Sequence, residues 1–152
     1  MYFIDRSKIT ETVIYMDTLV KLYEDKKEWL SFTDHLALER LTNNLIESII
    51  DVGNSMIDGF IMRDPGSYED IIDILTDEKV VAPEMDEPLK QVIGLRKMLV
   101  REFTAVDHQQ LQEVVDHNLE ALKNFGPKVE YYLEHELGPV SAFLPENKNE
   151  KL

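Results

Sequence analysis

The chain has 152 residues, of which 43% are hydrophobic and 30% are charged, and its formal net charge is −14. This balance is typical of a soluble globular domain with a sizeable core, and no apolar run approaches the length of a membrane span. The lack of cysteine excludes disulfides, cysteine nucleophiles and thiolate metal sites. An acidic surface commonly serves solubility, and it would repel phosphates almost everywhere. Any RNA binding therefore depends on a local cluster of cations.

Two helices are predicted in the first 62 residues. Ser7 is the expected N-cap of the first helix, whose apolar residues recur at helical spacing: Ile9, Val13, Met16, Val20 and Tyr23. The same spacing from about Asp34 to Met62 predicts a long central helix, in which Gly53 and Gly59 are weak points or points of close packing.

A short helix and a fourth helix follow the turn at residues 63–67. Ser67 and Asp70 have the spacing of a capping box, which begins a short helix that runs through about Glu78. After Val80–Pro83, helical spacing predicts a fourth helix with one arginine in its apolar stripe: Leu89, Val92, Arg96, Leu99, Val100 and Phe103.

The fifth predicted helix begins at Asp107, whose spacing to Gln110 is that of an N-cap. Pro127 should kink or interrupt it, because proline lacks the N–H that a helix interior requires. The chain is therefore predicted to be all-α, an antiparallel bundle of about five helices in one domain over residues 1–137, with a polar C-terminal tail over 138–152. The first residues lack the pattern of a signal peptide, so we expect a cytoplasmic protein.

The predicted fourth helix carries strong cations on an otherwise apolar surface, and a half-buried cation usually has a partner or a function. Its sequence over 94–103 is Gly-Leu-Arg-Lys-Met-Leu-Val-Arg-Glu-Phe. On an ideal helix Arg96 and Phe103 lie nearly on one line, whereas Arg101 lies about 140° round from Arg96. Both guanidinium groups therefore reach one small ligand only through long side-chain reach, a helix distortion or a second chain.

This segment resembles the signature of the HepT-like branch of the HEPN superfamily, in which Arg, a short spacer, His and a nearby Tyr form a ribonuclease site. Arg96 stands at the Arg position and Asp107 at that of a following Asp, but Arg101 replaces the His and Phe103 the Tyr. The resemblance covers roughly residues 34–135, including the stretch 38–46 and the Pro-x-Ser-Tyr turn that ends at Tyr68.

The resemblance implies a metal-independent cleavage, in which the RNA 2'-hydroxyl attacks the adjacent phosphate, His moves protons and Arg stabilises charge. Arg96 and Arg101 stand at these two catalytic positions. Arginine stays protonated and has no acceptor, so Arg101 can bind phosphate but cannot act as a general base. Together with Lys97, the two arginines therefore form a predicted phosphate-binding or RNA-binding patch.

Two alternatives concern the same residues. Glu102 or His108 could supply the missing proton transfer, although neither stands at the matching position. Arg96 could instead be structural, paired with an inward carboxylate of the central helix, Glu39 or Glu47.

The resemblance also implies partners. Signature helices of the family meet in a two-fold homodimer, and Val100 and Phe103 would lie in such an interface. The family Tyr at the position of Phe103 accepts AMP from a minimal nucleotidyltransferase antitoxin, but a phenyl ring has no hydroxyl to modify. No membrane and no cofactor are expected. No metal is expected either, because the four histidines lack the spacing of metal ligands, and the nearest pattern, Glu113 with His117, is interpreted as a solvent-facing pair.

Two functions of different class follow. The preferred hypothesis is a catalytically weakened or silent relative that keeps the fold, the dimer and a phosphate-binding, RNA-binding or partner-binding role. The alternative is an active endoribonuclease toxin that an antitoxin neutralises. They differ in whether any group near Arg96 can move protons.

Overall fold

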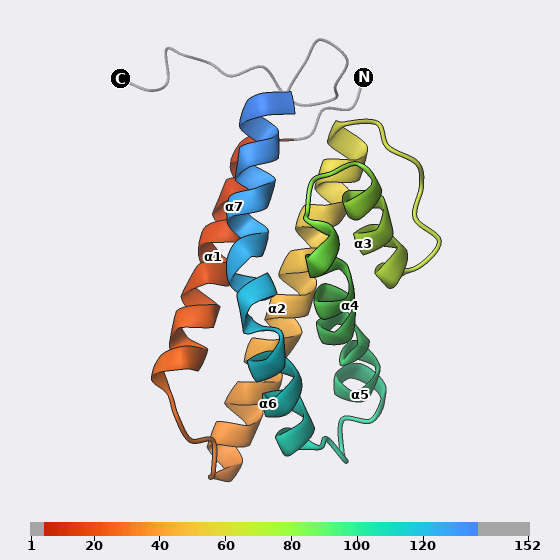
Figure 1. Ribbon diagram of the computed structural model, residues 1–152. Coiled ribbons are helices and arrows are strands. Elements are labelled where there is room, and N and C mark those ends of the chain that lie inside the picture. The colour runs from red at the N-terminus through yellow and green to blue at the C-terminus, as the bar shows by residue number, and fades with distance from the viewer. Residues whose placement is uncertain (1–4, 137–152) are drawn as a thin grey trace.

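The computed structural model describes residues 5–136 of the chain, and this part is entirely helical apart from its connections. Figure 1 shows a tall bundle in which α1 and α7 lie side by side, α2 runs through the middle, and α3, α4 and α5 follow one another along the other side. The all-α prediction is confirmed, and the predicted tail lies outside the described residues. The elements are α1 (Arg6–Asp25), α2 (Phe32–Gly59), α3 (Tyr68–Asp77), the 3-10 helix η1 (Pro83–Met85), α4 (Asp86–Gly94), α5 (Arg96–Arg101), α6 (His108–His117) and α7 (Leu119–Glu136).

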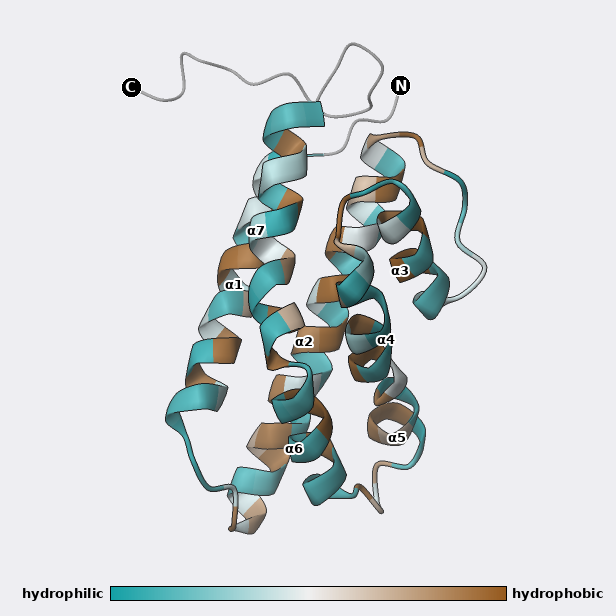
Figure 2. Ribbon diagram, in the orientation of Figure 1, coloured by the Kyte–Doolittle hydropathy of each residue, from teal (hydrophilic) through white to brown (hydrophobic). Residues whose placement is uncertain are grey.

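The central helix α2 is the scaffold of the bundle, since it contacts α1, α3, α5 and α6. Its predicted apolar stripe is buried, and residues such as Leu38, Leu45, Ile49 and Met56 have no exposed surface. Burial of each such side chain contributes about 1.5 to 3 kcal/mol. In Figure 2 the hydrophobic stretches of the helices lie mainly between the helices, while the outer faces are hydrophilic.

The helix starts confirm two predicted caps and correct one. Ser67 accepts a hydrogen bond from the Asp70 N–H at the start of α3, and Asp107 accepts one from Gln110 at the start of α6. Only this half of the predicted capping box is present at α3, because the Asp70 carboxylate accepts from Arg63 and from the Gly66 N–H instead of from the Ser67 N–H. The N-cap of α1 is Asp5 instead of Ser7, because the Asp5 carboxylate accepts from both the N–H and the hydroxyl of Ser7. A helix begins where a side-chain oxygen reaches a free N–H two or three residues ahead, and Asp5 has that position.

The predicted fourth helix is two helices, which is a correction with consequences for the site. At Leu95 the chain tightens, because its N–H donates to the Val92 carbonyl three residues back. This 3-10 type turn lets Leu95 join the core although it follows the buried residue Ile93 by only two positions. α4 therefore ends at Gly94 and the short α5 starts at Arg96, so Phe103 lies beyond the helix end at Arg101.

The predicted fifth helix is also divided, at Asn118 instead of Pro127. Asn118 is only 3% exposed, and its side-chain amide donates to the Val114 carbonyl and to Gln91 on α4. A buried amide that bonds the preceding turn competes with helix continuation. Pro127 instead stands inside α7 on an exposed face. Its neighbour Gly126 allows close packing, because a Cβ there would lie 2.6 Å from Val13 of α1.

Gly53 is a point of close packing, one of the two alternatives predicted for it. A Cβ at this position would lie 2.4 Å from Cγ2 of Ile71, which is closer than real side chains approach. The missing side chain lets α3 lie directly against α2. This contact fixes the start of α3, and with it Tyr68, relative to the central helix.

Candidate phosphate-binding site

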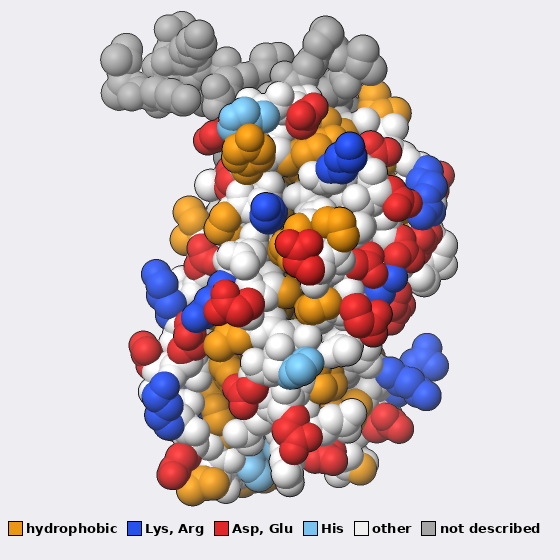
Figure 3. Space-filling view, in the orientation of Figure 1, with side chains coloured by type: hydrophobic (Ala, Val, Ile, Leu, Met, Phe, Trp, Pro, Cys, Tyr) orange, Lys and Arg blue, Asp and Glu red, His pale blue; other side chains and the backbone are white. Residues whose placement is uncertain are grey.

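Three cations surround one surface hollow at α5. This hollow, here called the cation hollow, has a volume of about 270 Å³ and is lined by Tyr68, Glu69, Ile93, Gly94, Arg96, Lys97 and Arg101. Figure 3 shows blue side chains together at the lower right edge, at the level of α5 in Figure 1, whereas red side chains are scattered over this face. Long side-chain reach therefore suffices for both arginines to line one hollow within a single chain.

Arg96 is half-buried and keeps most of its donors available. Its Nε donates to Glu47 Oε1 over 3.3 Å, so one of the two structural pairings considered for it is present. Both partners are substantially exposed, and exposed pairs contribute little to stability. Among the described residues, Nη1 and Nη2 of Arg96 donate no hydrogen bond. The two terminal nitrogens of the guanidinium thus remain available within the described part of the chain, while Nε is held by Glu47.

Lys97 and Arg101 are exposed and stand four residues apart on α5, on the same side of the helix. Neither forms an ion pair with any side chain of residues 5–136. In contrast, Lys90 of α4 is paired with both Asp73 and Asp86, which raise its pKa. Within the described residues, Lys97 and Arg101 of α5 are therefore the unpaired cations beside the hollow, and an anion would be attracted there.

The two alternative proton carriers are not part of the hollow. Glu102 is the exposed C-cap of α5. His108 Nε2 lies 2.8 Å from Glu39 Oε2, and the His108 ring stacks on His35 with a centroid distance of 4.0 Å. Glu39, the other carboxylate considered for Arg96, is thus used by His108. His35 and the pairing of His108 were not predicted, because residues 69 positions apart show no local pattern.

Tyr68 is the residue of the site that sequence reasoning missed. Tyr68 ends the predicted Pro-x-Ser-Tyr turn, yet it is 43% exposed and its ring lies under the Arg96 guanidinium, 4.6 Å from Cζ to the centroid. Such a cation–π contact holds the guanidinium plane over the ring. Its place in the Pro-x-Ser-Tyr turn was a visible signal, but no local pattern indicates that this turn faces α5.

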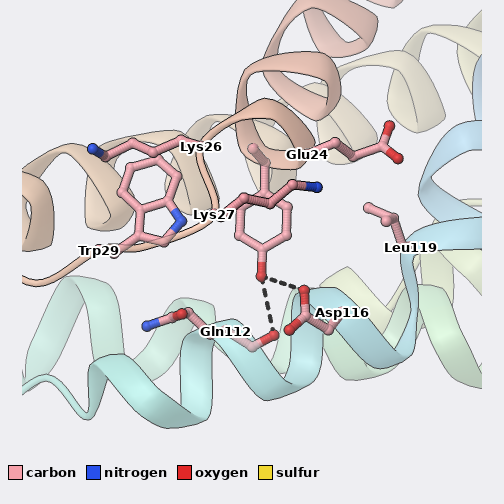
Figure 4. A pocket seen from close by; sticks show the side chains of 8 residues that line it. Glu24, Lys26, Lys27, Trp29, Gln112, Asp116 and Leu119 are labelled. Carbon is pink, nitrogen blue, oxygen red and sulfur yellow. Dashed lines mark hydrogen bonds between the residues drawn. The ribbon is translucent and has the colours of Figure 1, made fainter.

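A second hollow lies between the end of α1 and α6 and has a volume of about 280 Å³. Figure 4 shows Lys26 across the Trp29 ring on one side and Gln112 and Asp116 on the other. The Tyr23 hydroxyl donates to Asp116 Oδ1 over 2.6 Å, and its burial, together with Asp116, raises the pKa of Tyr23. This hydrogen bond joins α1 to α6, and we interpret it as a structural contact.

Other candidate features of the described chain are limited. Glu113 accepts a hydrogen bond from Gln109, and both Glu113 and His117 are exposed. Within residues 5–136 no group of three or more His, Asp or Glu side chains is arranged to hold a metal ion. In the same part of the chain, no helix combines the length and the apolar character that crossing a membrane requires.

Comparison with known proteins decides the family. The model of the family "Ribonuclease HepT-like" matches residues 10–129. The chain belongs to this HepT-like family. It is 48% identical over 143 residues to YutE of Bacillus subtilis (strain 168), a protein with a provisional RNase name, and the match covers 94% of this chain and 99% of YutE. A solved structure of YutE, described there as a cytosolic protein of unknown function, matches with a TM-score of 0.87 at 48% identity, covering 94% of this chain and 100% of that chain.

More distant structures share the HepT-like fold. The tri-AMPylated HEPN toxin of Shewanella oneidensis, solved in complex with its MNT antitoxin, matches with a TM-score of 0.70 at 20% identity and covers 81% of this chain and 96% of that chain. The assignment of Arg96, Arg101 and Phe103 to the Arg, His and Tyr positions of the family signature remains a prediction from the sequence.

Proposed function

We propose that this HepT-like protein holds phosphate groups of RNA in the cation hollow and cleaves RNA weakly or not at all. The observation that supports this is the lining of the hollow: Arg96, Lys97 and Arg101 supply positive charge, while none of the described histidines lines it. General acid-base assistance contributes about 10² to 10⁴-fold to such reactions. Without it, a well-held phosphate still reacts near the background rate.

RNA cleavage and anion binding by the purified protein test this proposal together. We expect salt-sensitive binding of single-stranded RNA that falls at least tenfold in Arg96→Ala, with cleavage near background in both proteins. Salt sensitivity follows from displacement of counterions from the phosphates. Robust cleavage that disappears in Arg96→Ala would contradict the silent role, and binding that is indifferent to Arg96→Ala would leave this arginine a structural partner of Glu47.

We also propose a cytoplasmic homodimer in which α5 and its neighbours face a second copy. Val100 is 45% exposed and Phe103 65% exposed, next to the cation hollow, and a two-fold contact would cover both in each chain. Val100→Glu or Phe103→Glu should shift the protein toward monomer, since a buried unpaired charge would occur twice. Light scattering that gives a monomer for the unmodified protein at micromolar concentration would exclude this interface.

An active toxin restrained by a nucleotidyltransferase antitoxin is the second candidate. The observation in its favour is the fold shared with HEPN toxins solved in complex with antitoxins. A nucleotidyltransferase gene beside this one, and a stable complex of the two products on gel filtration, would support it. The position of Phe103 predicts that such a partner would not modify this residue, and mass spectrometry after incubation with ATP would test that.

A further inference from the structure

Two hollows of different chemistry share Tyr68 and Glu69 in their linings. The first is the cation hollow, and the second is a hollow of about 370 Å³ lined by Asn54, Pro65, Gly66, Ser67, Tyr68, Glu69 and Ile71, here called the loop hollow. Arg96 covers one face of the Tyr68 ring at 4.6 Å. A phenol ring has two faces, so a partly exposed Tyr68 keeps surface available for a second planar group.

The charged residues that line the two hollows indicate that each would bind a different kind of ligand. The cation hollow has three cations against one carboxylate, Glu69. The loop hollow has no cation in its lining, but it has the Glu69 carboxylate, the Asn54 amide and the Ser67 hydroxyl. The Glu69 carboxylate would repel a phosphate in the loop hollow. An uncharged ring with amino and carbonyl groups could instead form hydrogen bonds there with Glu69, Asn54 and Ser67. A nucleobase has this chemistry, and carboxylates and amides are common partners of base edges.

The loop that lines this hollow is rigidly held. Arg63 forms two hydrogen bonds with Asp70, of 2.7 and 2.8 Å, and the Gly66 N–H donates to the same carboxylate over 2.8 Å. The Arg63 guanidinium and the Gly66 N–H hold the pKa of Asp70 well below its usual range. Because the loop is fixed at both ends in this way, a ligand would not have to order it on binding.

We propose that Tyr68 stacks a nucleobase of the RNA whose phosphate lies in the cation hollow, with Glu69 and Asn54 available to the base edge. This inference rests on the proposed phosphate-binding function and adds to it a subsite for the base. Arg96 touches the Tyr68 ring and also lines the cation hollow, so base and phosphate can be bound together. Stacking on an aromatic side chain tolerates different bases, and the preference is therefore for unpaired RNA over paired RNA.

The test compares two oligonucleotides of equal length and charge, one a single-stranded RNA and the other an abasic version without bases. Fluorescence anisotropy gives the affinity of each for the unmodified protein, Tyr68→Phe and Tyr68→Leu. We expect the unmodified protein to prefer the RNA by about tenfold, a size typical of one stacked base. Tyr68→Phe should keep this preference, and Tyr68→Leu should lose it while binding the abasic strand within about twofold of the unmodified protein.

The abasic strand distinguishes a lost stacking surface from a displaced Arg96, since only the latter weakens binding of a strand without bases. Circular dichroism checks that Tyr68→Leu is folded, and Asn54→Asp gives a second variant, in which added negative charge should favour bases with amino groups. No preference for bases in the unmodified protein, or an unchanged preference in Tyr68→Leu, would overturn the subsite. If Arg96→Ala fails to weaken binding of the abasic strand, the proposed phosphate site itself is wrong.

Discussion

Arg96 and His108 are bound to carboxylates that stand eight residues apart on α2. Arg96 Nε lies 3.3 Å from Glu47, and His108 Nε2 lies 2.8 Å from Glu39. Eight residues of helix span about 12 Å. Proton transfer requires contact within about 3.2 Å or through one water molecule. A phosphate held by Arg96 is therefore out of reach of His108 of the same chain.

This separation predicts how activity can be restored. The double change Arg101→His with Phe103→Tyr places an imidazole with a near-neutral pKa at the edge of the cation hollow, and we expect RNA cleavage to rise about 10²-fold. Adding Arg96→Ala should abolish the gain, whereas adding His108→Ala should leave it unchanged. Cleavage of a labelled single-stranded RNA measures each variant, and a gain that depends on His108 would contradict the separation inferred from α2.

Glu47 should limit anion binding at the hollow. In Glu47→Gln the carboxylate beside Arg96 is gone, and we expect the affinity for inorganic pyrophosphate or a short RNA to rise about twofold to fivefold, in line with the small energy of an exposed ion pair. Glu39→Gln is the matched control, because its carboxylate lies on the same helix but contacts His108. Isothermal titration at low salt measures both, and equal effects of the two changes would indicate only a general charge effect.

Two glycines should respond in opposite directions to the same change. Gly53→Ala forces the added Cβ against Ile71 and should destabilise the protein by about 1 to 3 kcal/mol. A Cβ on Gly94 meets no atom within 4 Å, so Gly94→Ala should stabilise the end of α4 by about 0.5 to 1 kcal/mol. Urea unfolding followed by circular dichroism gives both values, and destabilisation by Gly94→Ala would show that its conformational freedom is needed there.

Asp34 should contribute to acid unfolding. Its hydrogen bond with Lys26, and next that with the Ser31 N–H, lower the pKa of Asp34 from 3.8 to about 2. A carboxyl with a lowered pKa stabilises the fold above its unfolded pKa, so this stability is lost as the pH falls from about 4 to about 2.

In Asp34→Asn we therefore expect lower stability at neutral pH and a shallower loss of stability between pH 4 and pH 2. The matched control is Asp51→Asn, at an exposed position of the same helix. Urea unfolding at several pH values measures the slope. An unchanged slope in Asp34→Asn would mean that other carboxyl groups dominate in this range.

Local sequence patterns determined the helices and several of their ends. Apolar spacing predicted the five helical segments, and the Ser67 and Asp107 caps could be recognised because each involves a residue only three positions away. The signature residues placed the cations of the site on one segment. Caps and amphipathic stripes are interactions between near neighbours in sequence, so they are present in the sequence itself.

Only the tertiary structure decided how these segments meet. The apolar spacing predicts one continuous helix through Leu95, but the helix divides there. The side chain of Leu95 is buried in the core, whereas that of the next residue, Arg96, lies at the surface. Arg96 meets Glu47 across 49 positions, and His108 meets Glu39 across 69. Tyr68 acquires its contact with Arg96 only when α3 packs against α2 at Gly53. These pairings depend on the packing of whole helices against one another, and spacing within a single helix carries no information about them.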